Sequence, residues 1–331
     1  MKASQLTNTL RALIDEKIPT FVWGAPGIGK SSIVKQISED LEIGFIDLRL
    51  SLMDPTDLKG IPFYDSDEHR ALWAPPAFLP REGSGILFLD ELNSAPPSVQ
   101  ASAYQLILDR KVGEYELPKG WAIVAAGNRE GDRGIVYKMS APLANRFVHL
   151  EMDIHVNDWR DWAFAKGIDE RIIAYISYKH EELFSFDPLL NEKSFATPRS
   201  WEFVHKVLCS NLSAELLLET ISGAIGRERA VDFLSFISVA KELPSIERIL
   251  KEGEAEYTDD VEVLYALTSG LVSSYMRNES GEALENLLGY SLNMQSEFAV
   301  LMVQDLQRSG VNMEQSENFT AWVTKFAYLL E

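Results

Sequence analysis

The residues with the clearest chemical meaning form one short segment near the start of the chain. Residues 24–31 read Gly-Ala-Pro-Gly-Ile-Gly-Lys-Ser, which has the spacing G-x-x-x-x-G-K-[ST] of a phosphate-binding loop. Glycines let backbone N–H groups turn toward a polyphosphate, and the N-terminus of the following helix attracts the same negative charge. The segment therefore predicts a nucleotide-phosphate site made by Gly24, Ala25, Pro26, Gly27, Ile28, Gly29, Lys30, Ser31 and Ser32.

Two side chains of this loop have separate predicted roles. Lys30 is expected to reach the β- and γ-phosphates of ATP, and the Ser31 hydroxyl is expected to bind Mg²⁺. The flanks agree, because residues 20–23 have strand character and residues 31–37 begin a helical pattern. Strand, glycine loop and helix is the context in which this motif binds phosphate, whereas a plain turn before a helix is the alternative.

A pair of carboxylates at the end of an apolar run is the second candidate. Residues 86–91 read Ile-Leu-Phe-Leu-Asp-Glu. Asp90 could hold Mg²⁺, usually through water, and Glu91 could polarise an attacking water. A strand that simply ends in a charged turn would look the same. The phosphate loop earlier in the chain favours the catalytic interpretation.

Three further polar residues are candidates that the local sequence alone does not settle. Asn128 follows the apolar run 123–126 and could orient the same water, although Gly-Asn is also a common turn. Arg146 could project from a short helix and stabilise γ-phosphate charge in a neighbouring subunit, or it could form a surface salt bridge. Arg199 follows Thr-Pro at a predicted helix start and could point toward the nucleotide, or it could be solvated.

These candidates need a sheet to position them, and residues 1–150 alternate short apolar runs with helical patterns, as parallel α/β sheets do. Two stretches interrupt this alternation and are predicted to be β-hairpins, residues 60–75 and residues 111–120. The predicted strands are residues 20–24, 44–50, 85–89, 121–126 and 147–152, and the predicted helices are residues 30–40, 98–108 and 141–145.

Beyond about residue 153 the strand signals stop and the apolar spacing becomes helical, for example at residues 216–225 and 261–271. A length of 331 residues and a hydrophobic content of 46% suit about two domains with real cores. The predicted fold class is therefore α/β, with a P-loop NTPase parallel sheet that carries two β-hairpin inserts and is followed by an all-α part.

Composition and charge limit the cellular location and the classes of partner that are expected. The net charge is −19, of which residues 1–150 (16 Lys/Arg, 19 Asp/Glu) carry −3 and residues 151–331 (15 Lys/Arg, 31 Asp/Glu) carry −16. The acidic half is a poor surface for nucleic acid, and it could equally serve solubility or dock a partner. No apolar run is long enough to span a membrane, and the single cysteine, Cys209, forms no intrachain disulfide, so a cytoplasmic location is expected.

In this order and spacing, the five motifs resemble those of an AAA+ ATPase. Residues 45–60 (Phe-Ile-Asp-Leu-Arg-Leu…Asp-Pro-Thr-Asp-Leu-Lys-Gly) and residues 90–97 (Asp-Glu-Leu-Asn-Ser-Ala-Pro-Pro) look like the MoxR family, which belongs to the clade with a β-hairpin inserted in its second helix. The two predicted hairpins lie where that clade has its inserts. The likeness covers residues 1 to about 240.

The resemblance implies roles for the candidates and an assembly. It divides the chain into an AAA+ core (1–153), a helical lid (154–244) and a C-terminal helical extension (245–331), for which no motif is found. It implies a ring, a hexamer as in this family, with ATP and Mg²⁺ between subunits. Asn128 corresponds to sensor 1, Arg146 to an arginine finger that acts in trans, and Arg199 to sensor 2. One departure is that residues 127–130 read Gly-Asn-Arg-Glu where the family more usually has Thr-Gln-Asn-Pro.

The resemblance also implies a function and a kind of partner. Proteins of the MoxR family resemble chaperones that remodel other proteins, and they typically work with a partner that carries a von Willebrand factor A (VWA) domain. This variant is similar to those paired with a VWA-like, metallopeptidase-type protein. Two alternatives stay open, a nucleotide-gated scaffold with negligible turnover and, less favoured by the charge, a nucleic-acid motor. A GTPase fits worse, because the chain contains no Asn-Lys-x-Asp.

Overall fold

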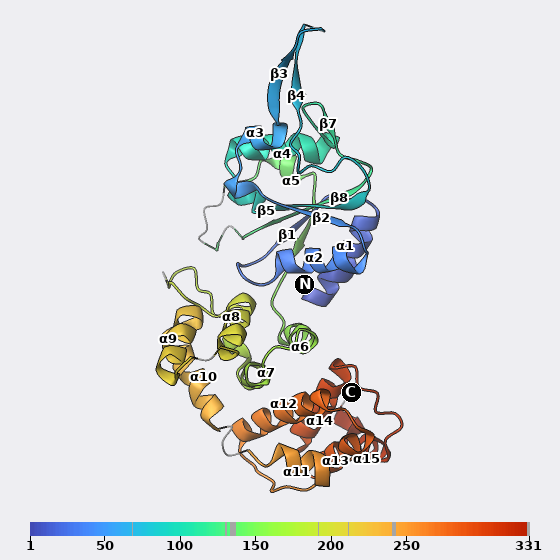
Figure 1. Cartoon of the computed structure of the whole chain (residues 1–331), viewed down its shortest axis with the longest axis vertical. Coiled ribbons are helices and arrows are strands. Elements are labelled where there is room, and N and C mark those ends of the chain that lie inside the picture. Colours follow the sequence, from blue (N-terminus) through green and yellow to red (C-terminus); the bar gives the residue numbers. More distant parts are fainter. Residues whose placement is uncertain are drawn as a thin grey trace. The chain divides into compact units, whose positions relative to one another are not determined.

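The chain divides into two compact units, each described here by itself (Figure 1). The computed structural model describes residues 1–67, 69–129, 131–132, 137–190, 192–210, 212–239 and 243–329. Unit 1 contains Met1–His155 with Asp187–Leu190, and unit 2 contains Val156–Phe186 with Asn191–Glu331. The expected division into residues 1–153, 154–244 and 245–331 stays a prediction, because unit 2 holds the helices on both sides of residue 244.

Unit 1 is built on a five-stranded sheet in the order β2-β5-β8-β1-β9, in which every pair of neighbours is parallel. This confirms the predicted parallel α/β sheet. Since all carboxyl ends lie at one edge, polar residues that directly follow the strands come together there. The strands are β1 (Thr20–Trp23), β2 (Gly44–Arg49), β5 (Ser84–Asp90), β8 (Gly120–Gly127) and β9 (Val148–Glu151).

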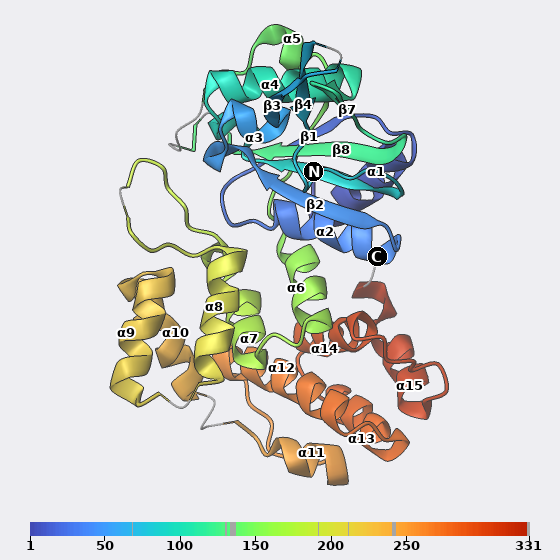
Figure 2. The ribbon, with the colours of Figure 1, turned by 45° about the horizontal axis from the view of Figure 1, so that its top comes forward.

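Helices cover both faces of the sheet, with α1 and α2 on one face and α3 and α4 on the other (Figures 1 and 2). The central strands β5 and β8 are buried almost throughout, which explains their continuous apolar runs. The helices and 3₁₀ turns of unit 1 are α1 (Ala3–Asp15), α2 (Lys30–Asp40), η1 (Leu50–Leu52), α3 (Pro55–Lys59), η2 (Leu92–Ser94), α4 (Pro97–Asp109) and α5 (Ala141–Ala144).

Both predicted hairpins are present as antiparallel pairs. The first consists of β3 (Ile61–Asp65) and β4 (Arg70–Ala74), and it projects from the sheet layer (Figure 1). The second consists of β6 (Lys111–Val112) and β7 (Tyr115–Glu116). Gly60, before the first hairpin, has φ 87°, and a Cβ there would lie 1.9 Å from the Ala74 carbonyl oxygen. Only glycine therefore fits where the two ends of this hairpin meet.

The predicted element ends differ from the structure by one or two residues. Gly24 still donates a backbone hydrogen bond to Gly127, but the chain then curls into the loop, so β1 ends at Trp23. Leu50 starts a 3₁₀ turn instead of ending β2. Gly120 belongs to β8 and not to the second hairpin.

Unit 2 is helical in its described residues, as predicted from the apolar spacing. None of the described helices combines the length and the apolar character needed to cross a bilayer. The elements are α6 (Val156–Ala165), α7 (Glu170–Tyr178), η3 (His180–Leu183), α8 (Pro198–Leu208), α9 (Ala214–Ile225), α10 (Arg227–Val239), α11 (Ile246–Glu252), α12 (Val261–Arg277), α13 (Gly281–Ser291), α14 (Ser296–Arg308), α15 (Glu317–Phe326) and η5 (Ala327–Leu329).

The leucine run in α9 shows how the helical pattern divides between core and solvent. Ile221 and Ile225 are buried, whereas Leu216 is 56% exposed. Three consecutive leucines cannot share one helix face, because each residue turns the helix by about 100°. Helices α11 to α15 contribute to a second hydrophobic core, whose buried side chains include Trp322, Leu267 and Met302.

Candidate functional site

The loop between β1 and α2 has the backbone shape that its glycines predict. Gly27 has φ 78° and Gly29 has φ 102°, both in the left-handed region. A Cβ built on Gly29 meets no atom within 4 Å, so the loop is open on that side. Within the described residues, the backbone N–H groups of Gly27, Ile28, Gly29 and Ser31 donate to no acceptor. Donors in this arrangement fit the oxygens of a polyphosphate.

Lys30 is held at the mouth of this loop. Its side chain is 8% exposed, and its Nζ donates to the backbone oxygens of Gly24 at 2.7 Å and Ala25 at 2.9 Å. It also donates to Oδ1 of Asn128 at 3.1 Å. These three acceptors are neutral oxygens, and phosphate oxygens in their place would bring a gain in charge pairing with Lys30. The same hydrogen bond brings two sequence candidates, Lys30 and Asn128, together.

Ser31 and Asp90 also lie together. The Ser31 hydroxyl donates to Oδ2 of Asp90 at 3.0 Å, and the backbone N–H of Glu91 donates to Oδ1 at 3.0 Å. A hydroxyl beside a carboxylate at the phosphate loop fits Mg²⁺, which protein sites hold with one or two such groups plus phosphate oxygens and water. Within the described residues, no group of three carboxylate, His or Cys side chains is arranged to hold a metal ion by itself.

Glu91 has an unusual backbone and a specific side-chain partner. Its φ of 56° lies in a region that non-glycine residues seldom adopt, and its carbonyl accepts hydrogen bonds from Ser94 and Ala95, which fixes this conformation. Its Oε2 accepts a hydrogen bond from the hydroxyl of Ser51, which follows β2. This bond satisfies one carboxylate oxygen and restrains the side chain for which the sequence predicts a water-activating role.

Asn93 connects the end of β5 to the end of β8. It is 1% exposed, and its Nδ2 donates to the backbone oxygen of Asn128 at 2.7 Å. A Cβ on Gly127 would lie 2.1 Å from Asn93 Oδ1, so the glycine before Asn128 is needed for this close approach. Asn93 thereby fixes the position of the Asn128 backbone at the carboxyl edge of the sheet.

A third carboxylate, Asp47, lies near Asp90 and Glu91. Burial is the largest cause that raises its pKa, followed by repulsion from Asp90; Arg49 opposes this, and Glu91 adds a further increase. Because a raised folded-state pKa favours protonation, the charged form of Asp47 lowers stability at neutral pH. Negative charge therefore accumulates at the edge where Ser31 and Asp90 could hold Mg²⁺.

Replacing Asp47 with asparagine is expected to raise Tm at pH 7 without nucleotide. Asp47 as a whole is exposed and only its carboxylate loses part of its hydration against neighbouring groups, so the gain is expected to be a few degrees at most. The repulsion exists only above the raised pKa, so the gain should shrink as the pH falls from 7 toward about 4. Thermal unfolding at both pH values measures this, with Glu82→Gln as the charge-matched control. An equal or lower Tm at pH 7 for Asp47→Asn would contradict the repulsion.

The two arginine candidates lie in different units. Arg146 follows α5 in unit 1, and its exposed guanidinium has no ion pair or hydrogen bond with the described residues. Arg199 is exposed in the first turn of α8 in unit 2, where Thr197 caps the helix and Pro198 is its first residue, as predicted. The roles of both arginines toward a nucleotide stay predictions.

Three residues of the site were missed in the sequence: Ser51, Asn93 and Asp47. Ser51 and Asp47 belong to β2 or its end, and they reach the site because β2 pairs with β5. Asn93 lies two residues beyond Glu91, and the only indication of it in the sequence is its place in the MoxR-like segment 90–97. Nothing in the residues alone indicates which strand lies beside β5.

Comparison with known proteins gives one family match. A family model described as "ATPase family associated with various cellular activities (AAA)" matches residues 20–149, which include β1, the phosphate loop, Asp90, Glu91, Asn128 and Arg146. A search of curated proteins gives no match.

Solved structures with a similar chain path include two bacterial proteins. The RuvB Holliday junction branch migration motor of Thermotoga maritima is 17% identical, with a TM-score of 0.40 over 85% of this chain and 86% of that one. NtrX of Brucella abortus in complex with ATP is 15% identical, with a TM-score of 0.40 over 92% of this chain and 68% of that one.

Proposed function

We propose that this chain, whose residues 20–149 form an AAA-type ATPase domain, hydrolyses ATP with Mg²⁺ and uses the cycle to remodel or activate a partner protein. The observation that carries the chemistry is the 3.0 Å hydrogen bond between Ser31 and Asp90, because it joins the phosphate loop to the strand-end carboxylate. Lys30 and Asn128 meet at the same edge and support the proposal.

In the proposed reaction, water attacks the γ-phosphorus in line with the bond to the leaving ADP oxygen. Glu91 takes the proton of this water, Asn128 orients the water, and Lys30 stabilises negative charge on the γ-phosphate and the leaving group. Mg²⁺, held by Ser31 and Asp90, would neutralise charge on the β- and γ-oxygens. ADP and inorganic phosphate are the products.

The assembly is proposed from the likeness to MoxR-type AAA+ proteins. We propose a homo-oligomeric ring, with six subunits as in that family, in which Arg146 completes the site of a neighbour. Its guanidinium is exposed and has no ion pair or hydrogen bond within the described part of the chain, which supports a role outside its own subunit. Arg199 would act from the lid. The protein partner would carry a VWA-type domain or be a VWA-like, metallopeptidase-type protein.

One observation favours a second candidate, a nucleotide-gated switch with little turnover. Ser51 holds the Glu91 carboxylate, and an isolated chain with this contact would hydrolyse ATP slowly until a neighbour or partner released it. Steady-state rates over a range of protein concentrations separate the two candidates. A rate per subunit that rises with concentration supports the ring ATPase, whereas a negligible rate at every concentration supports the switch.

The ring and the arginine finger are tested by mixing two variants. Glu91→Gln should bind ATP without hydrolysing it, and its solution mass with Mg·ATP is expected to be about six subunits. Arg146→Ala should also be inactive. A 1:1 mixture of the two is expected to recover about a quarter of the parental rate per site, because one interface in about four then combines an intact Glu91 with a neighbour's intact Arg146. A mixture without any recovery would remove Arg146 from its proposed role in trans.

A further inference from the structure

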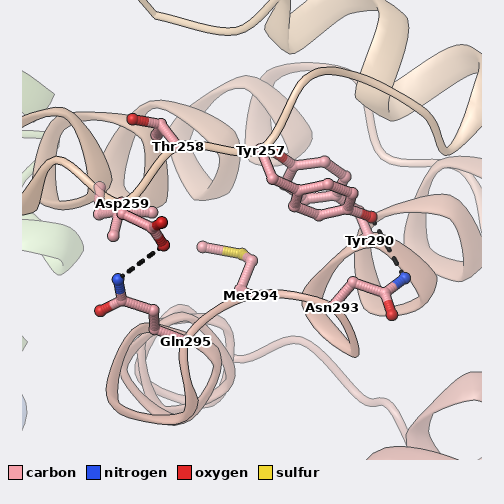
Figure 3. A pocket seen from close by; sticks show the side chains of 8 residues that line it. Tyr257, Thr258, Asp259, Tyr290, Asn293, Met294 and Gln295 are labelled. Carbon is pink, nitrogen blue, oxygen red and sulfur yellow. Dashed lines mark hydrogen bonds between the residues drawn. The ribbon is translucent and has the colours of Figure 1, made fainter.

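A cavity in the C-terminal helices of unit 2 has no part in the proposed ATPase chemistry. It lies between the loop before α12 and the turn that joins α13 to α14, and its volume is about 220 Å³ (Figure 3). Sites for drug-sized ligands usually have about 300–1,000 Å³. This cavity therefore suits a single side chain better than a nucleotide or a large cofactor.

One wall of the cavity is a pair of stacked tyrosines. The rings of Tyr257 and Tyr290 lie 4.8 Å apart between centroids, with an angle of 9° between their planes. Tyr290 is buried, whereas Tyr257 is 52% exposed. Asn293 Nδ2 donates to the Tyr257 hydroxyl at 3.2 Å, and the Tyr290 hydroxyl donates to the Glu256 carbonyl at 3.2 Å. The outer ring is thus held in place and still accessible.

The opposite wall carries a carboxylate. Oδ1 of Asp259 accepts a hydrogen bond from Gln295 Nε2 at 3.1 Å, while Oδ2 accepts none from the described residues. Met294 lies between this wall and the tyrosines (Figure 3). The cavity therefore combines an aromatic face, an apolar floor and one available carboxylate oxygen.

The loop that forms the cavity is anchored at both ends. At its start, Asn286 of α13 donates to the Leu250 carbonyl at 3.1 Å, and Gly253 ends α11 with φ 73°. At its end, Asp260 caps α12 by accepting from the backbone N–H groups of Glu262 and Val263. A pocket with fixed walls costs a ligand little reorganisation.

The charge around the cavity selects the sign of its ligand. From residue 253 to residue 262 the chain has no Lys or Arg, and it has five carboxylates, whereas one cation, Lys325, donates to the Leu292 carbonyl at the α13–α14 turn. These acidic residues are Glu254, Glu256, Asp259, Asp260 and Glu262. They create a negative potential that attracts a cation and repels an anion.

We propose that this cavity binds an arginine side chain from a basic segment of a protein partner. A planar guanidinium can stack on the exposed ring of Tyr257 and donate to the Asp259 carboxylate, whereas the lysine ammonium has no flat face for stacking. The aliphatic stem of the arginine would lie on Met294. The pocket gives the C-terminal extension a docking function that is independent of the nucleotide site.

The test is fluorescence anisotropy of a labelled peptide, Gly-Ser-Arg-Gly-Arg-Ser-Gly, titrated with the 331-residue chain without nucleotide. Saturable binding is expected, about tenfold weaker for Tyr257→Ala and for Asp259→Asn, and unchanged for Glu314→Gln, an exposed acidic residue outside the cavity. A peptide with citrulline in place of both arginines should not bind, and one with lysine should bind several-fold more weakly than the arginine peptide.

Three results would overturn this proposal. Equal binding by Tyr257→Ala, Asp259→Asn and the parent would show attraction to the acidic surface without a pocket. Absence of saturation up to about 1 mM peptide would exclude a specific arginine site. Self-association of the parent that Asp259→Asn abolishes would make a second copy of the chain the occupant. Asp259→Asn should hydrolyse ATP at the parental rate. Failure of the arginine-site proposal can therefore be distinguished from failure of the ATPase proposal.

Discussion

Replacing Glu91 with glutamine is expected to lower kcat for ATP hydrolysis about 10²- to 10⁴-fold while ATP still binds. The amide keeps the size of the side chain and can still accept the hydrogen bond from Ser51, but it cannot take a proton from water. The phosphate contacts come from Lys30 and the loop backbone, which this change leaves in place. Hydrolysis is therefore lost at the chemical step and not at binding.

Phosphate release measures kcat, and a fluorescent ATP analogue measures affinity. Glu82→Gln is the control, because it makes the same charge change at an exposed position in unit 1. Turnover of Glu91→Gln at the parental rate would contradict its assignment as the base. A loss of ATP affinity together with turnover would instead indicate that Glu91 supports the shape of the loop.

Replacing Asp305 with alanine is expected to lower the free energy of unfolding of unit 2 by about 3–5 kcal/mol. Asp305 is 0% exposed and Arg160 is 3% exposed. One guanidinium nitrogen of Arg160 donates to both carboxylate oxygens at 2.6 Å, and Arg308 donates to Oδ1 at 2.9 Å. Burial already lowers the pKa of Arg160, so the loss of its partner leaves a costly buried cation.

Urea unfolding followed by circular dichroism, with hydrogen exchange in α6 and α14, measures this loss. The double variant Arg160→Met with Asp305→Leu should recover most of it, because well-packed apolar side chains can replace a buried ion pair. Glu252→Ala, which breaks an exposed pair with Arg248, should stay close to the parent. Unchanged unfolding of Asp305→Ala would contradict the predicted cost of leaving the Arg160 guanidinium buried without its carboxylate.

The sequence determined the features that depend on near neighbours along the chain. The phosphate loop is a local shape set by Gly27 and Gly29, and its spacing alone located Lys30 and Ser31 correctly at the start of α2. The strands were predictable because β5 and β8 are buried on both faces and must be continuously apolar. Helix α8 was predictable because Thr197 and Pro198 form a standard start.

Only the tertiary structure decided which distant residues meet. Ser51 contacts Glu91 across 40 residues because β2 pairs with β5, and the order of strands in a sheet leaves no mark on the residues of either strand. Arg160 forms an ion pair with Asp305, which is 145 residues away in the sequence. The sequence around each of them indicates only an ordinary charged residue on a helix. The stacked tyrosines 257 and 290 are a similar case. Local sequence patterns depend on backbone conformational preferences and on which face of an element is buried. The packing of the elements against one another determines which distant side chains are in contact.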